Sequence, residues 1–132
     1  MVPRGMVVGH GLDVVDVVDF SRLLCEPARS FLDRHFTVDE LAAAGNGVVQ
    51  VQRLAGRFAV KEAVLKALGV GWGNGVAFTD VEVITLETGA PTIMLKRKLA
   101  AIEQERGIIG WLVSVSHSGA VAVASVIAVG AP

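Results

Sequence analysis

Apolar residues recur at helical spacing through the middle of the chain, where the pattern predicts a helix over residues 49–68. One side of this helix carries a continuous apolar stripe, made by Leu54, Phe58, Leu65 and Leu68. Gly69 follows the last apolar residue and is typical of a helix C-cap. Glu62 and Lys66 lie one turn apart at the edge of the stripe, so charged groups are expected beside a face that packs in the core.

After residue 80 the apolar positions alternate with polar ones, which is typical of strands. Strands are predicted at 81–85 and 92–95, joined by a turn at 88–91. Two further strands, at 111–117 and 120–129, are joined by a tight turn. The last strand is apolar on both faces, and such strands are usually buried on both sides. In a small chain this suggests a subunit interface.

The rest of the chain is predicted to add one strand and four shorter helices. A short strand at residues 6–12 would deliver Asp13 to its end. Asp16 or Asp19 can cap the helix that follows, and Pro27 would end it. The four shorter helices are expected up to Leu24, over 30–35, over 38–44 and over 96–106. A capping box of Thr37 and Glu40 opens the third of them, and a break at 107–110 follows the fourth.

Together these elements predict an α+β protein, in which a small antiparallel sheet packs on one long central helix. The chain has 132 residues, enough for one domain with its own core, which we place at residues 6–132. Residues 1–5 are interpreted as an added or disordered N-terminal segment, with Met6 as the natural start. The apolar fraction is 52% and the charged fraction 19%, which indicates either an unusually well-buried chain or apolar surface hidden in an oligomer.

Charge and cysteine content narrow the class of function. The formal net charge of −1 lacks the basic footprint of a nucleic-acid-binding protein. No apolar run reaches the roughly 20 residues of a membrane span, and residues 1–8 lack the apolar core of a signal peptide. A single cysteine, Cys25, excludes a disulfide within the chain and suits a reducing cytoplasm. Its apolar helical surroundings predict a buried packing role.

The candidate chemistry lies where the long helix runs into a loop with four glycines, Gly69, Gly71, Gly73 and Gly75. This combination indicates a site for a phosphorylated ligand, because Glu62 can hold a metal and Lys66 can bind phosphate oxygens. The alternative is an ordinary surface ion pair, since Glu four residues before Lys is the favoured orientation on any helix.

Three blocks of the sequence resemble the 4′-phosphopantetheinyl transferases of the holo-acyl-carrier-protein synthase type. Residues 57–71 match the family signature Arg-Phe-Ala-x-Lys-Glu-Ala-x-x-Lys-Ala-x-Gly-x-Gly. Residues 7–13 resemble its opening strand, which ends in Gly-x-Asp, and residues 113–118 resemble its late strand, which ends in Ser/Thr-His. Shorter matches at 36–40 and 89–91 follow in the expected order. The resemblance implies a homotrimer with ligand sites in the clefts between neighbouring subunits.

The resemblance also implies a reaction. The phosphopantetheine arm of coenzyme A would move onto a serine of apo acyl carrier protein, for fatty acid biosynthesis. The serine oxygen attacks the β-phosphate and adenosine 3′,5′-bisphosphate leaves. Asp13 and Glu62 match the family's metal-binding pair for Mg²⁺, with Mn²⁺ as the other candidate. On its own Asp13 would be interpreted as a helix cap or turn residue. No free side chain is assigned as the general base, and Glu62 acting through a metal-bound water is the candidate.

Further roles follow from the same resemblance. Lys66 matches a lysine that reaches the substrate phosphates, and Arg57 matches a second cation. Lys61 is interpreted as structural or as a contact across the trimer, because it points about 100° away from Glu62. The remaining matches are Gly69 and Gly73 for close approach of the nucleotide, Ser116 and His117 at the adenosine 3′-phosphate or pyrophosphate, and Pro91 approaching the adenine from a neighbouring subunit.

The sequence departs from the family at one position expected to contact the carrier protein. Family members often have an arginine six residues after the metal-binding aspartate, where this chain has Asp19. Arg22, Arg29 and Arg34 would then form a displaced basic patch, or simply a solvated face. Two other classes of function stay open: a coenzyme A or nucleotide-binding module without catalysis, and a structural oligomer. A transferase of broader specificity usually has a longer, duplicated chain.

Overall fold

The computed structural model of the chain describes residues 5–25 and 30–132. Its elements run in the order β1 (Met6–Asp16), α1 (Val17–Leu24), α2 (Ser30–His35), α3 (Val38–Ala44), α4 (Gly47–Leu68), a short 3-10 helix (Phe78–Asp80), β2 (Val81–Thr85), β3 (Pro91–Leu95), α5 (Arg97–Glu105), β4 (Ile108–His117) and β5 (Val121–Gly130). Pro27, Arg29 and residues 1–4, which the sequence predictions mention, lie outside the described residues.

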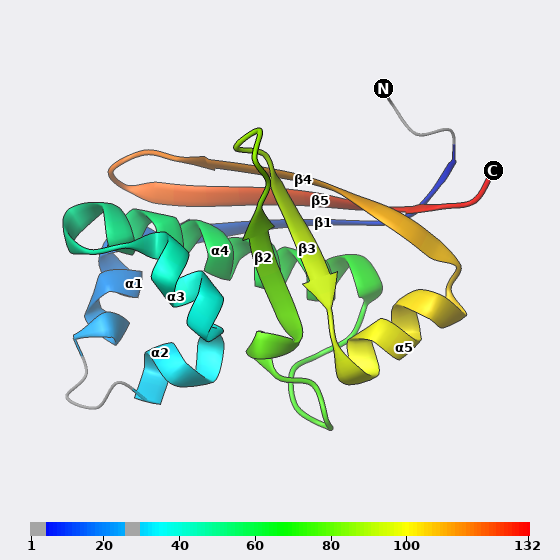
Figure 1. The fold of residues 1–132 in the computed structure, drawn as a ribbon, viewed down its shortest axis with the longest axis horizontal. Coiled ribbons are helices and arrows are strands. Elements are labelled where there is room, and N and C mark those ends of the chain that lie inside the picture. The colour runs from blue at the N-terminus through cyan, green and yellow to red at the C-terminus, as the bar shows by residue number, and fades with distance from the viewer. Residues whose placement is uncertain (1–4, 26–29) are drawn as a thin grey trace.

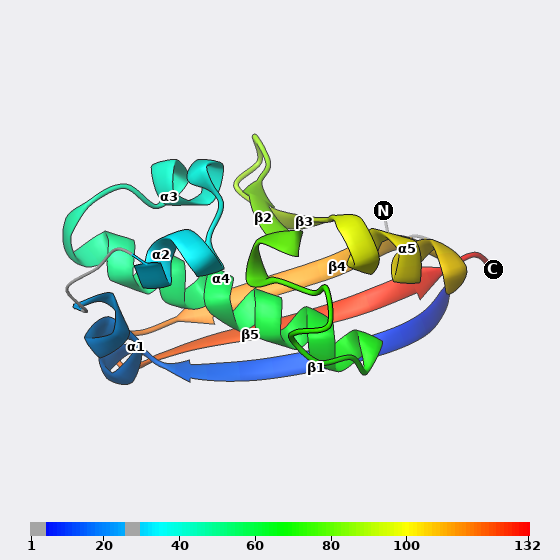
Figure 2. The same ribbon diagram turned by 90° about the horizontal axis from the view of Figure 1, so that it is seen from below.

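The long helix α4 packs on one face of a three-stranded antiparallel sheet, and a two-stranded antiparallel ribbon lies beside the β4 edge of that sheet (Figures 1 and 2). The larger sheet has the strand order β1-β5-β4, and the smaller is the β2-β3 ribbon. Both hairpins predicted from the alternating pattern are present, at β2-β3 and β4-β5. The α+β class is therefore confirmed, although the strands form two sheets and not one, because β3 contacts β4 without being paired with it.

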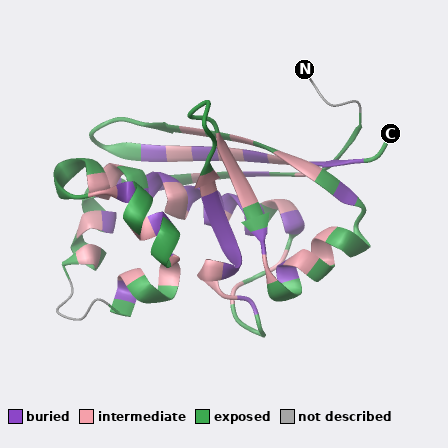
Figure 3. Cartoon of the chain, in the orientation of Figure 1, coloured by how far each residue is buried: buried purple, intermediate pink, exposed green. Residues whose placement is uncertain are grey.

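Helix α4 and strand β5 form the centre of the core. The predicted apolar stripe of α4 lies inside, since Leu54 is 0% and Leu68 2% exposed. On β5, every second residue faces α4, and all four of these side chains are fully buried: Ala122, Ala124, Val126 and Ala128. Strand β2 is also buried for most of its length (Figure 3). Gly69 caps α4 with a φ of 68°, as predicted for a left-handed C-cap.

Two glycines let β1 lie directly on the backbone of α4. A Cβ atom on Gly11 would lie 1.8 Å from the carbonyl oxygen of Ala63. A Cβ atom on Gly9 would lie 2.3 Å from the carbonyl oxygen of Ala67. Any side chain at these positions would push the strand away from the helix. The Gly-x-Gly-x-Asp segment therefore fixes the distance between the end of β1 and the charged edge of α4.

A buried ion pair connects α4 to α3, and further hydrogen bonds connect it to the 3-10 helix and to β2. Lys61 and Glu40 are both fully buried, with 2.9 Å between Nζ and Oε1. The ammonium also donates to the backbone carbonyls of Phe78 and Val81. The second carboxylate oxygen of Glu40 accepts from the amide of Val83 at 2.9 Å. Lys61 is therefore structural, which is one of the two roles predicted for it.

Most predicted caps are confirmed, and several boundaries are corrected. Asp16 caps α1 by accepting from the amide of Asp19 at 2.9 Å. Strand β1 does not end before Asp13: its ladder with β5 continues to Asp16, so Asp13 lies within a strand. Helix α4 begins at Gly47, and β4 begins at Ile108 because only Gly107 interrupts the chain there.

The prediction for Cys25 is wrong. This residue is exposed, because α1 ends at Leu24 and places the thiol beyond the packed part of the helix. Phe20, one turn earlier, supplies the buried contact on that side of α1 and is 2% exposed.

The face of the three-stranded sheet that points away from α4 is largely apolar and open. Leu12 and Val14 on β1 are 51% and 59% exposed, and Leu112 on β4 is 44% exposed. Strand β5 runs between them and presents the apolar side chains of Val123 and Ile127 on the same face. Exposed apolar surface of this kind marks an interaction site. Among the described residues, no helix combines the length and apolar character needed to cross a membrane.

Candidate active site

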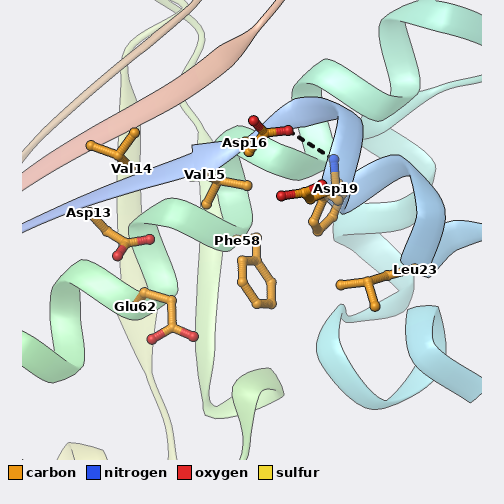
Figure 4. Close-up of a pocket in the computed structure, with 9 residues that line it drawn as sticks. Asp13, Val14, Val15, Asp16, Asp19, Leu23, Phe58 and Glu62 are labelled. Atoms are coloured by element: carbon orange, nitrogen blue, oxygen red, sulfur yellow. Dashed lines mark hydrogen bonds between the residues drawn. The ribbon is translucent and has the colours of Figure 1, made fainter.

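Asp13 and Glu62 face a common cavity of about 420 Å³ between β1, α1 and α4 (Figure 4). Asp13 comes from β1, which the two glycines hold against α4, and Glu62 comes from α4 itself. The walls of the cavity are otherwise mostly apolar, formed by Val14, Val15, Phe20, Leu23 and Phe58. Asp16 and Asp19 line its far end. Two carboxylates thus meet at the edge of a mostly apolar cleft.

The environment of Glu62 disfavours its charged form. Burial raises the pKa of the Glu62 carboxyl group above its ordinary value, and the charge of Asp13 raises it further. The Trp72 indole N–H and the charge of Lys66 oppose this shift. Trp72 nevertheless does not reach normal hydrogen-bond geometry, and its Nε1 is buried without a partner. A cation between the two carboxylates would relieve the repulsion between them.

Lys66 closes one side of this pair. Its Nζ lies 2.8 Å from Oδ1 of Asp13 and 3.1 Å from the carbonyl oxygen of Leu12. Hydrogen bonding to Asp13 raises the pKa of Lys66, so the amine is charged at neutral pH. The lysine side chain is 55% exposed. It can therefore move from Asp13 to an incoming anion at small cost, because exposed ion pairs contribute little.

The donor set fits Mg²⁺ better than a metal that needs a complete protein cage. Within residues 5–25 and 30–132, no cluster of three or more His, Cys, Asp or Glu side chains could hold a metal. Asp16 is occupied as the cap of α1, and Asp19 pairs with Arg22 at 3.0 Å. This leaves Asp13 and Glu62. Two carboxylates completed by water and substrate oxygens are the ligands that Mg²⁺ uses in phosphate chemistry.

Arg57, Pro91 and His117 line a second cavity of about 450 Å³. Arg57 donates weakly to the hydroxyl of Thr85, at 3.5 Å, and to the carbonyl of Arg53 at 3.3 Å. Its Nε is buried and has no partner. Burial lowers the pKa of Arg57, but a guanidinium stays charged in proteins. A cavity with unsatisfied arginine donors favours an anion.

The structure separates the predicted site residues into two groups within the chain. Asp13, Glu62 and Lys66 come together at the first cavity, and Arg57, Pro91 and His117 at the second. Arg57 points about 140° away from Glu62 around α4. The two cavities share no lining residue, so a single chain does not bring all these residues together. The predicted site between neighbouring subunits stays a prediction.

Three predicted residues lie in neither group. Ser116 alternates with His117 along β4 and faces the open side of the sheet, away from the second cavity. Gly69 and Gly73 lie in the loop after α4, both with positive φ, and neither lines the cavity of Asp13 and Glu62. Gly73 instead forms a closed turn with Val76, with reciprocal backbone hydrogen bonds of 3.0 and 3.1 Å.

The sequence interpretation missed Arg53, Thr85 and Trp72. Arg53 lies one turn before Arg57 and lines the same cavity, so its spacing could have identified it. Thr85 reaches Arg57 from β2 and is 28 residues away, which no local pattern indicates. The displaced basic patch is also weakened, because Arg22 is paired with Asp19.

The chain belongs to the 4′-phosphopantetheinyl transferase superfamily, whose family model matches residues 9–124. Among characterised relatives it is similar to the holo-[acyl-carrier-protein] synthase of Solibacter usitatus. The two are 36% identical over 122 residues, which cover 92% of this chain and 98% of the relative.

Solved structures of the same type share its fold. The holo-[acyl-carrier-protein] synthase of Neisseria meningitidis superimposes with a TM-score of 0.83 at 31% identity, covering 93% of this chain and 98% of that one. The holo-(acyl-carrier-protein) synthase of Bacillus anthracis in complex with CoA (3′,5′-ADP) gives a TM-score of 0.78 at 32% identity, covering 96% and 99%.

Proposed function

We propose that this protein transfers 4′-phosphopantetheine from coenzyme A to a serine of an apo acyl carrier protein, with release of adenosine 3′,5′-bisphosphate. One observation carries the proposal: Asp13 and Glu62 share a cleft with Lys66 beside them, in a chain of the phosphopantetheinyl transferase family. Relatives over nearly the whole chain are named holo-[acyl-carrier-protein] synthases, and several solved structures of such synthases are complexes with coenzyme A. The reaction would serve fatty acid biosynthesis in the cytoplasm.

Each residue of the first cavity has a defined task in this reaction. Asp13 and Glu62 would hold Mg²⁺ or Mn²⁺, which when bound offsets the negative charge of the pyrophosphate. Lys66 would leave Asp13 and bind an oxygen of the phosphate group at which the bond breaks. The apolar walls formed by Phe58 and Val15 exclude water from the transferred arm. Glu62, acting through a water molecule, is the candidate to accept the serine proton.

The second cavity would bind the nucleotide end of coenzyme A. Arg57 supplies an unsatisfied buried donor, and His117 and Pro91 line the same space. These groups suit the 3′-phosphate and the adenine ring that lies beside it. Gly69 and Gly73 line neither cavity, and their role in the close approach of the nucleotide stays a prediction.

A second copy of the chain would complete the site. Because the cavities lie on different sides of α4, one coenzyme A reaches both only if the second cavity belongs to a neighbouring subunit. The open apolar face of the three-stranded sheet, with Leu12, Val14 and Leu112, supplies a surface for this contact. We therefore propose a homotrimer with an active site at each subunit boundary.

The intact mass of an apo acyl carrier protein, after incubation with this protein, coenzyme A and Mg²⁺, tests the proposal. We expect a gain of one phosphopantetheine that disappears without metal and with Glu62→Ala. Glu105→Ala is the matched control, because Glu105 is exposed at the end of α5 and should leave the mass gain intact. Saturable coenzyme A binding without any mass gain would contradict the transferase and favour a non-catalytic binding module.

A further inference from the structure

Trp72 lies in the glycine loop after α4 and has no assigned role in the proposed reaction. Its indole Nε1 is buried and has no hydrogen-bond partner among the described residues. A buried N–H without a partner is costly, so native proteins rarely keep one without a reason. The sequence offers no hint of this atom's surroundings, because Trp72 is flanked by glycines on both sides.

The loop is closed firmly enough to hold the indole in place. Gly69 reverses the chain at the end of α4, and the amide of Val70 bonds back to the carbonyl of Leu65 at 3.2 Å. Reciprocal hydrogen bonds between Gly73 and Val76 then close the turn that directly follows Trp72. The loop therefore folds back along the helix, with little freedom at its base.

An aromatic stack directs Trp72 towards the face of α4 that bears Glu62. The ring of Trp72 stacks on Phe78, with centroids 3.6 Å apart and planes at 17°. Phe78 in turn stacks on Phe58, at 5.3 Å and 11°. Phe58 is one turn before Glu62 on α4, and both line the first cavity. The stack thus ends at the wall of the proposed active site.

Trp72 and Glu62 lie close to one another, although no hydrogen bond of normal geometry joins them. Trp72 lowers the pKa of the Glu62 carboxyl, against the effect of burial. Among the described residues, the carboxylate of Glu62 accepts no other hydrogen bond from a side chain or backbone amide. Terminal carboxylate torsions are broad and soft, so Glu62 has the freedom to turn towards the indole.

We propose that Trp72 is a positioning residue, whose indole N–H holds the oxygen of Glu62 that does not bind the metal. This inference rests on the proposed function, because Glu62 needs a fixed orientation only if it is a ligand. Metal-binding side chains are usually oriented by a further hydrogen bond of this kind. One oxygen of Glu62 then remains free for Mg²⁺, and its direction into the cavity is set by the rigid loop.

The substitution Trp72→Phe separates this role from packing, because phenylalanine keeps an aromatic ring on Phe78 but has no N–H. We expect the Mg²⁺ concentration for half-maximal transfer to rise on the order of 10-fold. The melting temperature without metal should stay near that of the wild type. Trp111→Phe is the matched control: its indole donates to Glu103 at 2.7 Å, between β4 and α5, and its loss should not change the Mg²⁺ requirement.

NMR gives a second readout that does not depend on turnover. The chain has two tryptophans, so its spectrum contains two indole N–H signals, and Trp111→Phe assigns them. Titration with MgCl₂ should move the Trp72 signal downfield and saturate, while the Trp111 signal stays in place. An unchanged Trp72 signal, or a Trp72→Phe enzyme with the wild-type Mg²⁺ requirement, overturns the role of Trp72 alone. Wild-type protein that transfers nothing and has no response to Mg²⁺ overturns the proposed function as well.

Discussion

The contact between β1 and α4 allows a sharp test, because one added methyl group must move the strand. In Gly11→Ala, the new Cβ atom would lie 1.8 Å from the carbonyl oxygen of Ala63, whereas real Cβ atoms do not approach such atoms within 3.0 Å. The backbone must therefore separate by at least about 1.2 Å. Asp13, two residues further along the same strand, moves away from Glu62 with it.

Two quantities should change, and by different mechanisms. Overpacking of this kind destabilises a protein by about 1–3 kcal/mol, which urea unfolding measures. A misplacement of about 1 Å in an active site lowers turnover on the order of 100-fold. Metal affinity, measured by calorimetric titration with Mn²⁺, should fall with turnover because the two carboxylates no longer face one ion.

Gly110→Ala is the matched control for this experiment. Gly110 lies in β4 of the same sheet, and no heavy atom lies within 4 Å of a Cβ built there. Its φ is not positive, so alanine fits without strain. We expect wild-type metal affinity and turnover. A Gly11→Ala protein with unchanged metal affinity and turnover would refute the reasoning, because the spacing of Asp13 and Glu62 would then not depend on the contact of β1 with α4.

Three further outcomes are expected. The pKa of Glu62 is raised, and its protonated form is a poor metal ligand, so the metal affinity of the wild type should begin to fall at a higher pH than it would with an ordinary glutamate. Calorimetry between pH 5 and 8 would show this loss, and an affinity independent of pH in that range would contradict it. Arg57→Gln should weaken binding of adenosine 3′,5′-bisphosphate about 10-fold or more but leave binding of 5′-AMP nearly unchanged, so an equal loss for both nucleotides would argue against a 3′-phosphate contact. Lys61→Met should destabilise the fold by about 3–5 kcal/mol in urea unfolding, since Glu40 is left as an unpaired buried charge, and Lys61→Met with Glu40→Gln should recover part of that loss.

The local signals in the sequence were sufficient for most of the fold. The 3.6-residue period located α4, and the cap at Thr37 was placed correctly because capping depends on neighbours a few residues away. Asp16 was one of the two candidates for the cap of α1, and the structure selects it over Asp19. The predicted end of the first strand was wrong, since pairing with β5 overrides the polar residue at Asp13. The ion pair of Lys61 with Glu40 joins residues 21 positions apart, so no periodic pattern reveals it.

The site was predictable in composition but not in arrangement. Family motifs indicated Asp13, Glu62 and Lys66, and these three residues do lie together. The position of Arg57 relative to Glu62 could have been inferred from the helical period, because five residues turn a helix by about 140° beyond a full turn. The partnerless N–H of Trp72 depends on how the loop folds back over α4, which requires the three-dimensional structure.

In the proposed trimer, the placement of the two cavities on different sides of α4 would link ligand binding to assembly. A molecule that contacts both cavities would contact two chains, so each binding event would stabilise the association of those chains by mass action. Coenzyme A would then hold the subunits together as well as serve as substrate. Upon dilution, specific activity should fall with protein concentration, and saturating coenzyme A should postpone that fall.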